Sequence, residues 1–574
     1  MKKRTIFLFG CLLLAGSIIG FSSCQKKDSG TGKDSLITLD VYSQAANFSG
    51  IQPGWYGELV KQKFNIALNI IAPQAGGGDA LYQTRAAAGN LGDIVLLNNP
   101  DFRDSVKAGL IKDISAEISK YTNVSAYMTQ INAFNSGLEG AKTGQIFGIP
   151  TQMTNTSPTT YTNLLVYSSP KTYWDYFAEV GAPQMKNLDD LLNVMAQIQK
   201  NHPVNKDGDP AYAVSLWKDW DGTSIENVNQ PLKWYGAEVG NDNGASVLID
   251  YKGGITPLTD DNAQYLKLLK FFFKANQMGL VDPDSGTQPW DNIVTKISTK
   301  RVYLLWYSWQ NGFWNSTAHG ESRENLMPIS VDDMVIFQNG DTYFGSERTW
   351  GIGSKVSGEK LDRVLSFIDW LASPEGIEYM HWGIPGFNYE ERADGTHERT
   401  PIGEVVFSEN PPVPESFGLG TGGWNDGNQK INQWLISDAS TNPKTGTPYM
   451  VDLWPAEIEK AKTATSREWA ARYGAEDQVA YLQKNNMLGI VPSVNVALPN
   501  DSTDMKLVRS QCGDIVKDTS WKMIFARNEA EFNRLWADMK TQLDGFGWAK
   551  LVEYDTQKCR LIVDARAKAL SDAR

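Results

Sequence analysis

The chain has 574 residues, 41% hydrophobic and 21% charged, so it is long enough for more than one hydrophobic core and has an ordinary globular composition. Its formal net charge of −12 disfavours nucleic acid or an anionic membrane surface as a partner, because phosphate-rich surfaces attract positive charge. We therefore expect a protein of at least two lobes that binds no nucleic acid.

The first 23 residues have the pattern of an export signal. Basic residues at positions 2–4 precede an apolar run over 6–21, and small residues end the run directly before Cys24. A cysteine there is typical of lipoproteins, so we predict acylation of Cys24 and a flexible tether over 24–35. Two alternatives stay open. Phe21, where Leu is usual, allows a plain secretory signal, and the apolar run, although short for it, allows an uncleaved membrane helix.

Short strands and helices alternate after the tether. Apolar alternation predicts strands over 37–42 and 66–70, with helices over 55–64 and 79–88 and a buried strand over 93–97. An extended segment over 145–151 and a strand over 163–167 follow. This order is typical of an α/β fold.

The later half of the chain is richer in amphipathic helices. We predict helices over 188–199, 263–279, 359–372 and 528–543, and a strand from Lys300 that leads into a Trp-rich loop at Trp309. Asn528 to Glu531 reads as a capping box. We expect Trp370, inside an amphipathic helix, to pack in a core.

The cysteines and histidines give little sign of a metal or redox site. Beyond the signal the cysteines are Cys512 and Cys559, and the sequence is compatible with a disulfide between them or with two buried free thiols. The four His are not spaced as ligand pairs, so we expect no metal and no cofactor.

The chain carries 19 Trp and 22 Tyr, and many of the Trp stand beside Gly, Asp, Asn or Ser rather than in apolar runs. The apolar C–H face of a sugar stacks on an aromatic ring, and its hydroxyls need carboxylates and amides. For each individual Trp, packing in a core is the alternative.

Several segments occur in an order that resembles the family 1 extracellular solute-binding proteins, the receptors of carbohydrate ABC importers. They include Asp93-Ile-Val-Leu-Leu-Asn-Asn-Pro-Asp-Phe, Gly144-Gln-Ile-Phe-Gly-Ile-Pro-Thr, Leu304-Leu-Trp-Tyr-Ser-Trp and Ile368-Asp-Trp-Leu-Ala-Ser-Pro-Glu-Gly. The likeness extends from about Ile37 to Tyr389. It implies a non-enzymatic α/β protein with the two-lobed, hinged type II periplasmic-binding fold. We expect a mostly helical C-terminal extension.

The resemblance implies a division of the chain. Lobe one would comprise residues 36–150 plus about 331–386, and lobe two residues 151–330 plus about 387–574 with the extension. The implied partners are a carbohydrate, the permease subunits of an ABC transporter and the membrane through the N-terminal lipid. We expect a monomer on the outer face of the cytoplasmic membrane.

The resemblance also implies that a sugar binds in the cleft between the lobes. Trp309 matches the position of a stacking aromatic residue, whereas Leu97 stands where related receptors often have one. The other candidate ligand-binding residues are Ser43, Gln44, Asn47, Asn98, Asn99, Asp101, Trp217, Asp219, Trp220, Trp350 and Trp424.

Two other classes of protein remain alternatives. A secreted carbohydrate-active hydrolase would need a pair of carboxylates, for which Asp219 with Asp221, Glu347 or Asp426 could serve, but no pattern pairs them. A structural or adhesive carbohydrate-binding lipoprotein would need no cleft.

Overall fold

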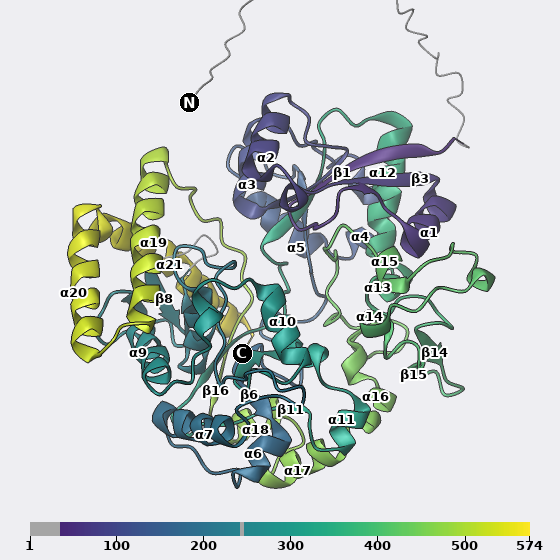
Figure 1. The fold of residues 1–574 in the computed structure, drawn as a ribbon. Helices are drawn as coiled ribbons and strands as arrows, with labels where there is room; N and C mark the ends of the chain where they lie inside the picture. The colour runs from purple at the N-terminus through teal and green to yellow at the C-terminus, as the bar shows by residue number, and fades with distance from the viewer. Residues whose placement is uncertain (1–34, 241–245, 574) are drawn as a thin grey trace, which may run out of the picture.

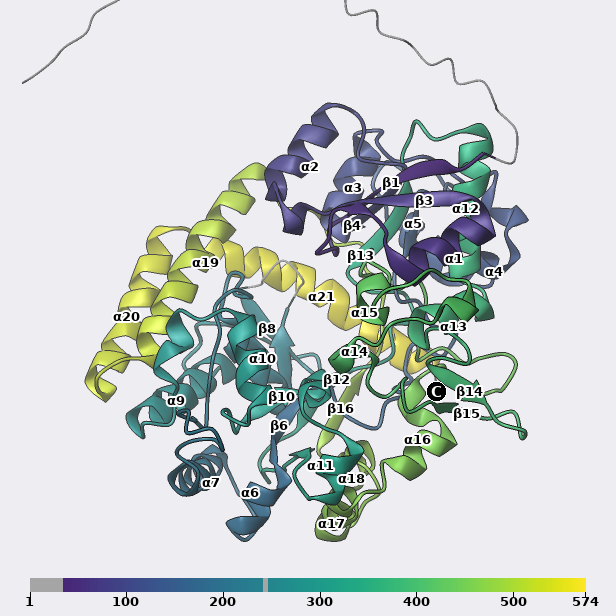
Figure 2. The same cartoon turned by 45° about the vertical axis from the view of Figure 1, so that its right-hand side comes forward.

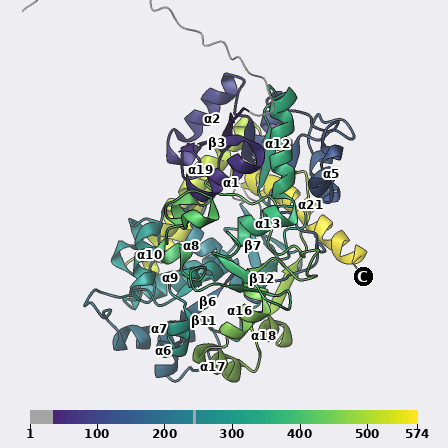
Figure 3. The same ribbon diagram turned by 90° about the vertical axis from the view of Figure 1, so that its right-hand side faces the viewer.

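The structure is a computed structural model that describes residues 35–240 and 246–573. The predicted signal peptide, Cys24 and the tether up to residue 34 lie outside the described residues. The described chain forms two α/β lobes with a helical C-terminal region, as predicted (Figure 1). Figure 3 shows from the side that lobe one, with α1 and α12, lies above lobe two, with α6 and α7.

Lobe one is built on a six-stranded sheet in the order β2-β3-β1-β4-β13-β5. Its strands are β1 (Ile37–Ser43), β2 (Gly50–Ile51), β3 (Ile66–Ile71), β4 (Ile94–Asn98), β5 (Gly148–Pro150) and β13 (Arg348–Ile352). The main helices of this lobe are α1 (Gly54–Phe64), α2 (Gly78–Ala87), α3 (Asn99–Lys107), α5 (Met128–Ser136), α12 (Gly358–Leu371) and α13 (Pro374–His381). Because β1 and β4 are parallel, their carboxyl ends lie at the same edge of the sheet.

Lobe two contains smaller sheets. The strand β6 (Ser168–Tyr173) lies between β10 (Leu305–Tyr307) and β11 (Leu326–Pro328), while β7 (Ala237–Val239), β8 (Val247–Asp250) and β9 (Ile255–Pro257) form another sheet. A third pair consists of β12 (Ile336–Asn339) and β16 (Leu488–Val491). The helices of lobe two that precede the C-terminal region include α6 (Trp174–Glu179), α7 (Leu188–Asn201), α9 (Gln264–Gln277) and α10 (Trp290–Ser298).

The residues after α13 divide between the two lobes. Apolar side chains from Ile384 to Trp454 join the core of lobe one, and those from Trp469 to Leu551 join the core of lobe two. The elements involved are β14 (Tyr389–Glu391), β15 (His397–Arg399), α14 (Val406–Glu409), α15 (Trp424–Gly427), α16 (Pro455–Lys460), α17 (Ala464–Tyr473), α18 (Gln478–Lys484), α19 (Thr503–Ile524), α20 (Glu529–Gly545) and α21 (Trp548–Asp572). The sequence-based division placed residues from about 387 onward in lobe two, whereas the apolar side chains from Phe387 to Trp454 pack in the core of lobe one. We call residues 384–454 the lobe-one extension.

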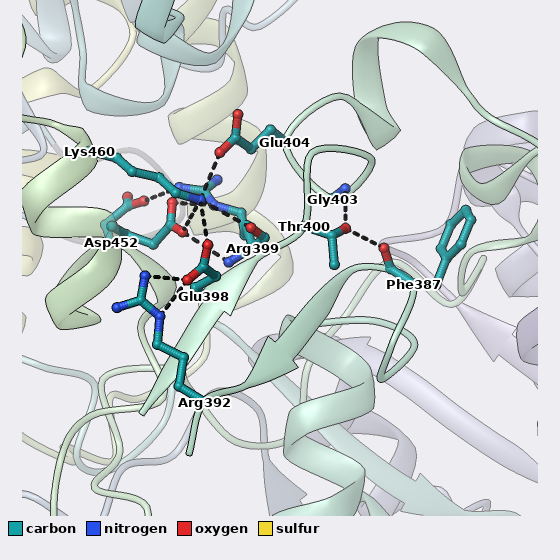
Figure 4. Close-up of polar contacts among 10 residues, drawn as sticks. Phe387, Arg392, Glu398, Arg399, Thr400, Gly403, Glu404, Asp452 and Lys460 are labelled. Atoms are coloured by element: carbon teal, nitrogen blue, oxygen red, sulfur yellow. Dashed lines mark hydrogen bonds and ion pairs between the residues drawn. The ribbon is translucent and has the colours of Figure 1, made fainter. Parts of the chain in front are cut away.

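Ion pairs fix the lobe-one extension to α16 (Figure 4). Lys460 Nζ lies 2.9 Å from Glu404 Oε1 and 3.1 Å from Glu457 Oε1, and Arg399 Nε lies 2.9 Å from Glu457 Oε2. Burial alone would raise the pKa of Glu457, but the hydrogen bonds and charges of Arg399 and Lys460 outweigh it and lower the pKa. The β14–β15 hairpin is therefore held to α16, and Arg392 and Glu398 pair within the hairpin itself.

Two segments that cross between the lobes, residues 151–167 and 340–347, are hydrogen-bonded to each other, and the second also bonds to the end of β16. Asp341 N donates to Thr160 O (2.7 Å), and Gly340 N donates to Val491 O (2.8 Å). The Asp341 carboxylate, which is buried, accepts from Thr162 N at 3.0 Å, and burial raises its pKa. Hydrogen bonds therefore hold these two crossovers together.

Two sequence predictions need correction. Residues 163–167 are not a strand; β6 begins at Ser168, directly after the expected segment. Cys512 and Cys559 are both free and buried, because Cys512 packs in the core of lobe two whereas Cys559 packs in a separate cluster with Val247. The disulfide alternative is therefore wrong.

Candidate functional site

An exposed cluster of aromatic rings lies on lobe two. Trp309 belongs to the 3-10 turn Ser308–Phe313 that follows β10, and its side chain is 37% exposed. Its ring stacks on Tyr307 with centroids 4.8 Å apart and lies 6.0 Å from Trp220 and 5.1 Å from Trp290. Trp220 is 38% exposed. We call Trp220, Trp290, Tyr307, Trp309 and Phe313 the aromatic platform.

Buried residues support this platform from below. Trp217 is almost fully buried and stacks on Trp306 at 5.5 Å with an interplanar angle of 14°. Its ring meets Trp290 edge-on at 4.9 Å. Asp219 is exposed, and both of its carboxylate oxygens accept from Trp290 N at 3.1 Å, which fixes the start of α10. Trp217 thus lies under the platform, while Asp219 lies at its rim.

The facing edge of lobe one is polar. Gln44 Nε2 donates to Asp101 Oδ2 at 2.7 Å, and Gln44 Oε1 accepts from Asn98 N at 2.7 Å. These residues follow β1 and β4, so the parallel strands bring the two loops together as the sequence pattern indicates. Asn98 is exposed, and burial raises the pKa of Asp101. Asn99 is engaged within the lobe, since its Oδ1 accepts from Thr349 Oγ1 at 2.7 Å.

The two surfaces face each other across the space between the lobes. The carboxylate of Glu347, beside β13 in lobe one, is near enough to Tyr167 of lobe two to contribute to the raised pKa of its hydroxyl, after burial as the largest cause. Trp309 also lies close to this hydroxyl and partly offsets the rise in its pKa. In Figures 1 and 2 α10, which carries Trp290, lies in the middle of the molecule on the side of lobe two that is nearest lobe one.

The remaining candidate residues lie elsewhere. The Ser43 hydroxyl is buried and donates to Ile431 O at 2.9 Å, and Trp350 is buried in the core of lobe one. Trp424 is also buried and stacks on Trp55 at 5.8 Å. Asn47 is exposed and lines a pocket together with Trp424. Trp370 packs in the core of lobe one, as expected.

Sequence reasoning did not identify four members of this region. They are Trp290 from α10, Tyr307 from β10, Phe313 from the turn after β10 and Tyr167 from the segment before β6. One signal in the sequence could have identified Trp290. In Pro289-Trp290-Asp291 an aromatic residue stands at a helix start beside an acidic residue.

The arrangement suits binding through stacking and hydrogen bonds. Asp221 has a pKa raised to about 6 by burial, but its carboxylate is engaged by Trp521 Nε1 at 2.6 Å and Glu226 N at 2.9 Å. Within residues 35–240 and 246–573 no group of three or more His, Cys, Asp or Glu side chains is placed to hold a metal ion. In the same residues no helix is long and apolar enough to cross a membrane.

The protein has two α/β lobes that are joined by crossovers. Lobe two presents the aromatic platform and lobe one the polar edge that faces it, and this arrangement defines a two-lobed solute-binding protein. The family model described as bacterial extracellular solute-binding protein matches residues 47–378, which is more than half of the chain. The chain therefore belongs to this family, whose members are binding proteins.

Solved structures with the same fold are distant in sequence. The alginate-binding protein AlgQ2 is 14% identical with a TM-score of 0.60, and the match covers 92% of this chain and 98% of AlgQ2. The Streptococcus pneumoniae ABC-transporter substrate-binding protein FusA, solved with kestose, is 13% identical with a TM-score of 0.59 and coverages of 92% and 98%. An HMO-binding solute-binding protein from Bifidobacterium longum infantis is 13% identical with a TM-score of 0.58, and the match covers 92% of this chain and 99% of that protein. No curated protein matches the sequence.

Proposed function

We propose that this protein is an extracytoplasmic receptor that captures a carbohydrate, most favourably an oligosaccharide, between its lobes and delivers it to the permease of an ABC transporter. The observation that carries the proposal is the aromatic platform, whose Trp309 and Trp220 rings are exposed although most other Trp side chains are buried. The similarity to ABC-transporter proteins solved with or named for oligosaccharides supports it.

The proposed mechanism is a hinge closure. A sugar ring stacks its C–H face on Trp309 and Trp220, and its hydroxyls pair with polar groups such as Asn98, Asp101 and Asp219. The lobes then rotate about the hydrogen-bonded crossovers, which buries the sugar and presents a closed shape to the permease. An acyl chain on Cys24 would hold the receptor near that permease. We keep the expectation of a monomer within this proposal.

The test is binding to a carbohydrate panel by the parent chain and the Trp309→Ala variant. We expect one class of oligosaccharide to raise the melting temperature of the parent and to change its Trp fluorescence. Trp309→Ala should weaken that binding by about tenfold or more, because it removes about 1 kcal/mol of stacking together with the apolar contact of the indole, and about 1.4 kcal/mol is tenfold. Phe546→Ala is the matched control, since Phe546 is an exposed aromatic residue in the turn between α20 and α21. Unchanged binding by Trp309→Ala would contradict the proposal.

The same assay separates the alternatives. A receptor returns the oligosaccharide intact, a hydrolase shortens it, and an adhesive protein ignores small sugars. Among the carboxylates considered for hydrolysis, Asp219 is engaged with the backbone of Trp290 and Asp221 with Trp521. The anchor has its own test: labelling with a palmitate analogue in a bacterial host should mark the parent and not Cys24→Ser.

A further inference from the structure

A pocket of about 550 Å³ lies in lobe one, away from the aromatic platform. Its walls come from the loop after β1, the end of α13 and the lobe-one extension. The side chains that define it are Asn47, His381, Phe407, Trp424, Lys430 and Trp434. We call it the Trp434 pocket. In Figure 2 α14 and α15, which contribute to it, are drawn below the sheet of lobe one and above β12 and β16.

The Trp434 pocket combines aromatic faces with polar side chains. Trp434 is half-buried, stacks on His381 at 6.0 Å and is held by donation from its Nε1 to Met380 O at 2.9 Å. Phe407 is 71% exposed and meets Trp424 edge-on at 5.0 Å. The polar members are amides, Lys430, His381 and Tyr379, and no carboxylate is among the described residues that line it. Phe407 thus presents an exposed ring at the pocket and packs by its edge against the buried Trp424.

One chain segment separates this pocket from the edge of lobe one that faces the platform. Asn432 Nδ2 donates to Ala45 O at 2.7 Å, and Ile431 O accepts from Ser43 Oγ at 2.9 Å, so residues 428–434 lie against the loop that carries Gln44. The neighbouring Gln433 Oε1 accepts from Arg348 Nη1 at 3.4 Å. Gln433 is almost fully buried, yet its Nε2 has no hydrogen-bond partner. A buried amide without a partner is costly, and this one lies in the segment that separates the pocket from the platform-facing edge, not in the pocket lining.

We propose that the Trp434 pocket is a second sugar-binding subsite, which takes an end unit of an oligosaccharide whose other units lie on the aromatic platform. The inference rests on the proposed function and makes it narrower, because it requires a ligand long enough to reach both places. Most of the pocket is formed by residues after 378, beyond the segment that matches the family model. Its volume lies in the range of small-ligand sites, and a lining of aromatic rings, amides, Lys430 and His381 accepts a neutral or carboxylated sugar.

The experiment compares ligand length with the position of the substitution. Homologous fructo-, malto-, manno- and alginate oligosaccharides of two to eight units are titrated by calorimetry into the parent, Phe407→Ala, Lys430→Ala and Trp309→Ala. Phe407→Ala should weaken the longer members of the binding series by about tenfold and leave the shortest binder unchanged. Trp309→Ala should weaken every length. Ile402→Ala is the control, because Ile402 is exposed in the same extension but does not line the pocket.

The outcomes separate the two proposals. If Phe407→Ala and Lys430→Ala bind every length as the parent does, while Trp309→Ala does not, the subsite is refuted and the receptor function stands. If the parent binds no member of any series, the receptor function is refuted and the subsite with it. Thermal unfolding of each variant shows whether a loss of binding reflects loss of fold.

Discussion

Replacing Lys171 by Met should stabilise the protein. Lys171 lies in β6, the central strand of its sheet, and its side chain is fully buried. Its hydrogen bond joins Nζ to Asn311 Oδ1 at 3.3 Å, and no carboxylate of the described residues lies within ion-pair distance. Burial therefore lowers the pKa of Lys171 from 10.5 to about 7.

The expected magnitude follows from this pKa. The pKa of Lys171 falls from 10.5 to about 7, and each pKa unit corresponds to roughly 1.4 kcal/mol. Burying the charged lysine therefore costs about 5 kcal/mol of folding free energy. Losing the hydrogen bond to the half-buried Asn311 offsets about 1 kcal/mol. Below pH 7 the lysine is charged in both states and the full cost applies. As pH rises from 7 towards 10.5 the folded protein has already lost the proton, so the cost shrinks, to about 2 kcal/mol at pH 9.

The assay is urea unfolding of the parent and Lys171→Met between pH 6.5 and 9.5. The variant should be more stable by a few kcal/mol at pH 7, with a difference that falls as pH rises. Lys206→Met is the control, because Lys206 is exposed in the same lobe and its replacement should change stability by less than about 0.5 kcal/mol at any pH. A Lys171→Met variant that is less stable at pH 7, or whose advantage does not depend on pH, would refute the reasoning.

Three further predictions concern buried contacts. Arg509→Ala should lower the free energy of unfolding by about 3–5 kcal/mol, because it leaves the fully buried Asp555 without a bidentate partner at 2.7 and 2.8 Å; a urea midpoint equal to that of the parent would contradict this. The pKa of Asp221 is raised to about 6, so the folded state holds this proton more tightly, and the parent should lose stability relative to Asp221→Asn as pH rises from 4 to 6. A stability difference that is constant over that range would be the contrary result. Gly148→Ala should lower the melting temperature and cost about 1–3 kcal/mol, because its Cβ would lie 2.7 Å from Phe102; an unchanged melting temperature would count against it.

Elements with a strong local pattern could be predicted from the sequence. The buried strand over 93–97 is observed as β4, and the Asn528 side chain caps α20 by accepting from Glu531 N at 2.9 Å. The strand β6 was misplaced because its sequence, Ser-Ser-Pro-Lys-Thr-Tyr, reads as polar although every residue in it is buried. Its burial comes from β10 and β11, which are distant in sequence, and no local pattern reports that.

The site shows the same limit at the level of single residues. Trp217 and Trp220 belong to one short motif, yet Trp217 is buried and Trp220 is exposed, because Trp306 covers only the first of them. Which tryptophan faces the ligand space is decided by tertiary packing. The chemistry of the loops after β1 and β4 was easier to predict, since parallel strands bring their carboxyl ends together whatever packs around them.

Several costly features lie together beneath the aromatic platform. Gln310 accepts with its Oε1 from Trp306 N and Tyr307 N, but its Nε2 is buried without a partner. The indole N–H groups of Trp217 and Trp306 are also buried and unpartnered, and Lys171 lies under the same turn through Asn311. Most buried polar groups in proteins have hydrogen-bond partners, so several unpartnered groups in one place lower the stability of the folded protein. Because the concentration coincides with the exposed Trp309, the stabilising change at Lys171 should carry a cost in ligand affinity that the control at Lys206 does not share.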